Sequence, residues 1–152
     1  MRRVFIGFVV IAISLVMALP AMAGPREDAK ALIEAAVAMV KDKGLDSTIA
    51  AIRDKSGPFF KGELYIFVGK LDKPMLTVHP VKPALEGRDM TKMKDVKGKY
   101  FFVEFMNTAK DPGSGWVEYY WPKPNEKKAS PKDTYVMRVP GQELWFACGY
   151  YK

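Results

Sequence analysis

The side chains best suited to chemistry lie in an aromatic stretch near the C-terminal end, GWVEYYWPKP at positions 115–124. In an extended strand, Val117, Tyr119 and Trp121 share one face and the residues between them share the other. Tyrosine and tryptophan each combine a large apolar area with one hydrogen-bond donor, which suits a pocket that encloses and orients a small ligand. A core strand has the same pattern, so the neighbouring residues must decide between the two interpretations.

Lys132 and Tyr135 follow downstream, three positions apart at the start of another expected strand. A regular strand directs them to opposite faces. A bend at Pro131 would bring the Lys132 ammonium to the face of Tyr119 and Trp121, where partial burial would strengthen its attraction for an anion. The alternative is an exposed loop lysine.

Three further residues are candidates for ligand contact. His79 is the only histidine, and it precedes a proline at an expected strand end, where it could hydrogen-bond a carboxylate or form a pH-sensitive contact. Its alternative is a strand-end histidine bonded to backbone. Arg88 is a second anion-binding candidate, with a solvated surface arginine as its alternative. Phe67 favours the core, although its strand face could form the floor of a pocket.

Catalytic and metal-binding patterns are not evident. An enzyme needs a nucleophile with an oriented base, or paired carboxylates in different environments. Cys148 and His79 offer the sole pairing of thiol and imidazole, but Cys148 lies in an apolar strand and is expected to be a small buried hydrophobe. No cluster has metal-ligand spacing, and no glycine-rich phosphate loop is present. We therefore expect no enzyme activity, no metal and no cofactor.

Residues 1–23 have the pattern of a signal peptide: a basic start, an apolar run and a small-x-small ending at Ala21-Met22-Ala23. Cleavage near Ala23 places the protein in the periplasm or outside the cell. A retained membrane anchor is the alternative, because the apolar run is not far below the roughly 20 residues that span a bilayer. The formal charge of +7 suggests nucleic acid only for a cytosolic protein; after export, an anionic ligand or surface is the better expectation.

The remaining residues, 24–152, are expected to form one domain of the α+β class. A helix over 25–43 ends at Gly44, and a second helix is expected from Asp46, as its cap, to about Lys55. The stretch 100–109 is compatible with strand or helix; its apolar spacing favours a helix, capped by Asp95. The aromatic stretch is a strand, 123–132 is a hairpin loop, and the other expected strands are 64–68, 75–79, 134–139 and 144–151.

This order predicts an antiparallel sheet of five or six strands. The long N-terminal helix covers one face. The irregular stretch 80–95 and the helix after it cover the other face, where they enclose a pocket on the sheet.

The motifs also match a known family when their order and spacing are taken together. They are Tyr65-Ile66-Phe67-Val68, His79-Pro80, Leu85-Glu86-Gly87-Arg88, Asp95 with Gly98, the stretch 115–124, Pro131-Lys132 with Tyr135-Val136, and Gly149-Tyr150-Tyr151. Together they span essentially all of residues 24–152 and resemble a Cache domain, the PAS-like extracellular sensor fold, of the single-Cache type.

The resemblance implies a domain that binds small molecules, often short carboxylates, and reports occupancy to a signalling partner. On this basis Tyr119, Tyr135 and His79 are expected to orient a small organic anion, with Lys132 supplying charge and Trp121 enclosing it.

Family receptors continue into a transmembrane helix, whereas this sequence ends at Lys152, so we expect a periplasmic binding protein. The alternative is a periplasmic interaction module that docks on a membrane receptor or transporter component without its own ligand. That module would expose Trp116 and Tyr120 as an adjacent aromatic patch. The sequence leaves the ligand, the partner and the oligomeric state open.

Overall fold

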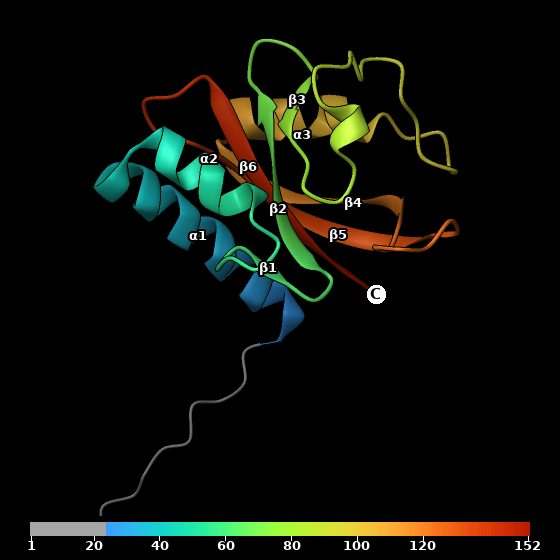
Figure 1. Cartoon of the computed structure of the whole chain (residues 1–152). Helices are drawn as coiled ribbons and strands as arrows, with labels where there is room; N and C mark the ends of the chain where they lie inside the picture. Colours follow the sequence, from blue (N-terminus) through green and yellow to red (C-terminus); the bar gives the residue numbers. More distant parts are fainter. Residues whose placement is uncertain (1–23) are drawn as a thin grey trace, which may run out of the picture.

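The computed structural model describes residues 24–152, so the predicted signal peptide lies outside the described residues (Figure 1). No helix within the described part of the chain is long and apolar enough to cross a membrane. The elements are α1 (Pro25–Lys43), α2 (Leu45–Arg53), β1 (Phe60–Lys61), β2 (Leu64–Lys70), β3 (Leu76–Val78), the 3-10 turn η1 (Pro83–Leu85), α3 (Phe101–Lys110), β4 (Ser114–Pro122), β5 (Ala129–Arg138) and β6 (Leu144–Tyr151).

The strands form a six-stranded antiparallel sheet in the order β1-β2-β6-β5-β4, with β3 paired to β2. This confirms the predicted α+β class and the antiparallel sheet. Strand β4 lies at one edge, where it pairs with β5 alone, from Ser114 opposite Met137 to Pro122 opposite Ala129.

Helix α1 lies along one face of the sheet, while α3 and the segment that contains η1 lie over the other (Figure 1). Acidic residues in the first turn of α1 and lysines in its last turn oppose the helix dipole, and Gly44 ends the helix at φ 84°. The side chains of α1 that the sheet buries recur at three- and four-residue spacing, as predicted: Ala29, Leu32, Ile33 and Ala36.

Two hydrophobic clusters lie on the two faces of the sheet. Alternation along β2 directs Tyr65 and Phe67 into the cluster beneath α3, whereas Ile66 and Val68 pack in the cluster beneath α1. Strand β2 is therefore covered on both faces, as its continuous apolar sequence predicts.

Two local predictions are wrong by a small shift. Helix α2 begins at Leu45 with Gly44 before it, so Asp46 lies in the first helical turn instead of capping it. Strand β5 begins at Ala129, inside the predicted loop 123–132, because its backbone already pairs with Pro122 at that point.

The prediction that Asp95 caps α3 is also wrong. Helix α3 starts after Tyr100 without a side-chain cap. The Asp95 carboxylate instead accepts hydrogen bonds from the backbone N–H groups of Lys97, Lys99 and Tyr120, at 2.8, 2.9 and 3.0 Å. It satisfies a donor on the open edge of β4 and fixes the loop before α3 against that edge.

Candidate ligand-binding site

Lys132 lies on the sheet face that α3 covers, among aromatic rings. Its side chain has no exposed area, and its Nζ donates a hydrogen bond of 3.0 Å to the Tyr65 hydroxyl. The same Nζ lies 4.2 Å from the ring centroid of Tyr65 and 4.8 Å from that of Tyr151. Among residues 24–152, no carboxylate forms a salt bridge with it. Burial lowers the pKa of Lys132 to about 7, because the interior disfavours the charged form.

The strand is regular at Lys132, so no bend at Pro131 is needed to bring the ammonium to this face. Lys132 is the direct cross-strand partner of Tyr119, which is itself buried. The Tyr119 hydroxyl accepts a hydrogen bond of 3.4 Å from Thr134 Oγ1, and its ring stacks on Phe101 of α3 at 4.5 Å. Burial raises the pKa of Tyr119, so its hydroxyl stays a neutral donor.

Gly149 provides the space that Lys132 and Thr134 occupy. A Cβ atom at this position would lie 2.0 Å from Thr134 Oγ1, 2.7 Å from the Asp133 carbonyl oxygen and 2.9 Å from Lys132 Cε. Gly149 pairs with Thr134 across the β5–β6 ladder, so a side chain has no other direction to take. Glycine at this position is therefore part of the site's geometry.

His79 follows β3 and is buried against this cluster, with its ring centroid 5.4 Å from that of Tyr65 and 5.5 Å from that of Phe67. Its Nδ1 accepts a hydrogen bond of 3.0 Å from the Lys82 backbone N–H, which leaves Nε2 as the donor of the neutral ring. Burial, and then the charge of Lys132, lower the pKa of His79 to about 3. The ring is therefore neutral near pH 7 and is no pH-sensitive contact there.

Glu86 holds the backbone around His79. Its Oε1 accepts a hydrogen bond of 2.8 Å from the His79 N–H, and its carboxylate accepts two bonds of 2.9 Å from Arg53 of α2. The segment after β3 is thus tied to α2 through a bidentate ion pair.

Trp121 and Lys82 form the half-buried outer side of the cluster. The Trp121 ring lies 5.5 Å from that of Phe101 and 6.4 Å from that of His79. Lys82 Nζ lies 4.6 Å from the Trp121 ring centroid. The Lys82 ammonium is thus a second cation beside the site. Its partial burial lowers its pKa.

Two predicted site residues do not join this cluster. Tyr135 lies on the opposite face, where it packs in the cluster beneath α1 with its ring 5.2 Å from that of Trp116. The reason is strand parity: the register that directs Lys132 toward Tyr65 directs the residue three positions later to the α1 side. Arg88 is exposed on the turn after η1, where its backbone N–H bonds to Leu85.

Cys148 also lies on the α1 face, opposite Tyr135 in the β5–β6 ladder. It is fully buried, and burial raises the pKa of its thiol to about 12. This confirms the predicted small hydrophobe, and the thiol is separated by the sheet from His79.

Trp116 and Tyr120 do not form the exposed aromatic patch of the alternative hypothesis. Both are half-buried. The Arg26 guanidinium lies 4.0 Å from the Trp116 ring centroid, and Lys97 Nζ lies 5.6 Å from that of Tyr120. Each ring is therefore partly covered by a basic side chain.

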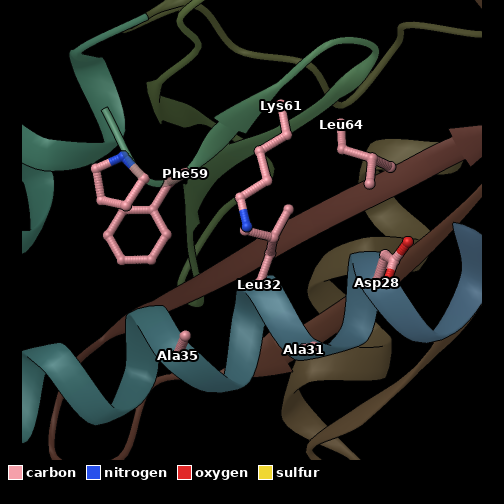
Figure 2. Close-up of a pocket in the computed structure, with 8 residues that line it drawn as sticks. Asp28, Ala31, Leu32, Ala35, Phe59, Lys61 and Leu64 are labelled. Atoms are coloured by element: carbon pink, nitrogen blue, oxygen red, sulfur yellow. The ribbon is translucent and has the colours of Figure 1, made fainter. Parts of the chain in front are cut away.

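A groove of about 640 Å³ runs between α1 and the β1–β2 hairpin, on the face away from Lys132 (Figure 2). Its walls are mostly small and apolar, with Asp28 and Lys61 as exposed charged residues. It contains no buried charge, so it offers a ligand little orienting chemistry.

Sequence reasoning missed Tyr65, Thr134, Gly149 and Lys82 as members of the site. One signal was available: Tyr65 lies two positions before Phe67, so an extended strand directs both to the same face. The other three depend on cross-strand register and on the path of the loop after His79, which no local pattern specifies.

Comparisons with known proteins agree with this architecture. A Cache domain family model matches residues 34–151. The methyl-accepting chemotaxis protein McpP of Pseudomonas putida is 31% identical over 72 residues, a match that covers 47% of this chain and 13% of McpP. The chain therefore spans a small part of this curated relative.

Solved structures give the same result over a larger share of the chain. The periplasmic sensor domain of a chemotaxis protein is 30% identical, with a TM-score of 0.66, covering 82% of this chain and 88% of that one. A Cache chemosensory domain solved to explain its carboxylic acid recognition is 24% identical, with a TM-score of 0.65 and coverages of 82% and 86%. A methyl-accepting chemotaxis protein from Vibrio parahaemolyticus shares the fold at 20% identity, with a TM-score of 0.71 and coverages of 83% and 87%. The family model matches most of the chain, and the six-stranded sheet agrees with the fold of the solved Cache domain. This protein therefore belongs to the Cache domain family, as a single Cache domain.

Proposed function

We propose that this Cache domain binds a short organic carboxylate in the periplasm, at the cluster around Lys132, and reports occupancy to a membrane receptor or transporter component. The periplasmic location is supported by the signal-like residues 1–23 and by the periplasmic sensor domain that resembles the chain. The ligand class is supported by the chemistry of the cluster.

The observation that carries the proposal is a buried ammonium without an acidic partner in the described part of the chain. Burying a charge is unfavourable unless a counter-charge and hydrogen bonds compensate it. Lys132 has one hydroxyl and three aromatic rings close by, which compensate its charge only in part. A bound carboxylate would supply the missing negative charge in a setting where the attraction is weakly screened.

If one carboxylate oxygen of the ligand pairs with Lys132, the neutral hydrogen-bond donors around Lys132 can bind the other carboxylate oxygen. The Tyr119 hydroxyl, the Tyr65 hydroxyl and the Nε2–H of His79 are all held neutral by burial, so they can donate without competing for the anion's charge. Aromatic rings fill most of the surrounding space, which favours a ligand of few carbon atoms. Trp121 and Lys82, on the half-buried outer side, must move to admit it.

Thermal unfolding of the purified protein with a series of short carboxylates tests the proposal. A ligand at 100 times its dissociation constant stabilises the folded state by about 2.7 kcal/mol, which raises Tm by roughly 5–10 °C for a domain of this size. Lys132→Met should abolish this shift while it leaves the unliganded protein folded, because it replaces an uncompensated charge by an apolar side chain of similar length.

The matched control is Lys128→Met, which removes a charge from the exposed β4–β5 loop and should keep the full ligand shift. The proposal fails if no carboxylate raises the Tm of the parent protein. It also fails if Lys132→Met and Lys128→Met respond to a ligand equally.

A further inference from the structure

The loop before α3, residues 91–100, concentrates positive charge and exposed apolar surface. It contains four lysines and one acidic residue, Asp95. Within residues 24–152, the two large hydrophobic side chains that are clearly exposed, Val96 at 70% and Tyr100 at 46%, both belong to it. Figure 1 shows this segment, in yellow, as an irregular excursion at the periphery of the fold.

The loop is held in place although it has no regular structure. As described above, the Asp95 carboxylate accepts three backbone N–H groups, one of them from edge strand β4. Lys99 Nζ adds bonds of 2.6 Å to the Glu118 carbonyl and 2.8 Å to the Glu104 carboxylate. The lysines and apolar tips are therefore presented on a fixed base, which lowers the entropy lost when the loop binds a surface.

Asp95 is directed inward, and three lysines are directed outward. Burial by itself would raise the pKa of Asp95, but the hydrogen bonds from backbone amides outweigh this effect and hold the pKa below its usual value. Lys92, Lys94 and Lys97 are exposed, and the ammonium of Lys94 lies 4.6 Å from the Tyr100 ring centroid. The outward face of the loop thus combines cationic heads with an aromatic and an aliphatic tip.

We propose that residues 91–100 form a docking surface for an anionic lipid bilayer. Lysines near an anionic membrane surface are each attracted by about 1 kcal/mol. Tyrosine favours the level of the lipid headgroups, and a valine tip can reach the acyl boundary beneath it.

A bilayer fits this loop better than an acidic protein does. A protein partner of specific shape requires a well-packed hydrophobic centre with a polar rim. Here the apolar atoms are two separate tips between lysines, on an excursion from the fold, which matches a soft and laterally uniform interface. Docking at this position would keep a Cache domain close to a membrane partner.

Vesicle co-sedimentation tests the proposal. The protein is purified in the form that remains after any processing of its N-terminal segment by the cell. Vesicles of phosphatidylcholine alone are compared with vesicles that also contain about one third phosphatidylglycerol. We expect binding to the anionic vesicles alone, and its loss at about 1 M NaCl, where the Debye length falls to about 3 Å. Replacing Lys92, Lys94 and Lys97 by glutamine should weaken binding about 100-fold, since about 1 kcal/mol per lysine is about fivefold each.

The matched control removes the same charge from Lys41 and Lys43, in the last turn of α1, and from Lys55, just after α2, and should bind nearly as the parent does. Val96→Ser with Tyr100→Ser should weaken binding by about tenfold, since apolar area no longer leaves water. All these side chains are exposed, so the variants should keep the Tm of the parent protein. If a triple variant has a lower Tm, the single lysine variants replace it, and each should weaken vesicle binding about fivefold.

Three results would overturn the proposal. The first is equal binding to neutral and anionic vesicles. The second is equal weakening by the loop variant and the control variant, which would show diffuse attraction by net charge. The third is a pair of observations: the Val96/Tyr100 variant binds vesicles as the parent does, and the parent binds soluble polyglutamate through the same three lysines. This pair would identify an acidic macromolecule as the partner.

Discussion

The charge state of Lys132 determines how the site depends on pH. Its pKa in the folded protein is about 7, and in the unfolded chain it returns to about 10.4. Between these values the unfolded chain binds a proton that the folded protein does not bind. Stability therefore rises with pH across this window, and below about pH 7 the folded protein carries a buried charge.

We predict that the free energy of unfolding increases between pH 7 and 9, by at most about 1.4 kcal/mol per pH unit from Lys132. Denaturant unfolding of the ligand-free protein at several pH values measures this slope. In Lys132→Met the slope should disappear, whereas Lys128→Met should retain it. A parent protein whose stability is flat or falling from pH 7 to 9 would contradict the depressed pKa.

His79 acts in the same direction over a lower pH range, because its folded pKa is also below the unfolded value. Its folded pKa of about 3 lies below the unfolded value of about 6.5, so the stability it contributes is lost as pH falls from 6.5 toward 3. The group that titrates near neutral pH is thus the lysine and not the histidine, contrary to the expectation from residue type. Ligand affinity should accordingly decline as Lys132 loses its proton.

At the scale of elements, the site depends on large side chains of β5 that lie opposite a glycine of β6. Lys132 and Thr134 extend from β5 over the backbone of β6, where Gly149 leaves room for both. The same arrangement recurs at Gly69 of β2, where an added Cβ would lie 2.0 Å from an atom of the Trp145 ring. Both glycines mark places where a side chain lies directly on a neighbouring strand.

We predict that Gly149→Ala destabilises the protein by about 1–3 kcal/mol, as overpacking in a core does, and weakens carboxylate binding by displacing Lys132. Thr134→Ala removes the nearest colliding atom, so the double variant should be more stable than the sum of the single effects predicts. Urea unfolding of the four proteins gives this coupling. Additive effects would show that Gly149 is not confined by Thr134.

At the scale of the whole molecule, β5 connects the site to α1. Lys132 is directed to the α3 side, and the next residue, Asp133, is directed to the α1 side, where it forms an ion pair with Arg26 in the first turn of α1 and accepts a hydrogen bond of 3.3 Å from Tyr150. We therefore expect a displacement of β5 at the site to reach the start of α1, because Lys132 and Asp133 are adjacent in the strand.

We predict that a bound carboxylate changes hydrogen exchange in the first turns of α1, residues 26–32, as well as around the site. Mass spectrometry of exchange with and without ligand measures the effect. Arg26→Gln should remove the change in α1 and leave the change around Lys132 intact. A ligand-induced change in exchange that is confined to the strands would show that the site around Lys132 is not coupled to the start of α1.

The sequence predicted the three α-helices and the five longer strands of residues 24–152, and both layers, because each rests on a local pattern, such as the apolar spacing of α1 and α3 and the alternation in β4. It did not predict the two-residue strand β1 or the turn η1, which are too short to carry such a pattern. The face of Lys132 could not be predicted in the same way. Parity established that Lys132 and Tyr135 lie on opposite faces, but the register of β5 with β4 decides which of them faces Tyr119. The roles of these residues in ligand binding remain predictions.

The three tryptophans have consequences for spectroscopy. Trp121 lies beside Lys82 at the outer side of the site, Trp116 lies beneath Arg26 at the start of α1, and Trp145 is fully buried with its Nε1–H bonded to the Lys70 carbonyl at 2.9 Å. Each indole thus reports a different region through its emission. Variants that retain one tryptophan at a time would separate events at the site, at the helix and in the core without an added label.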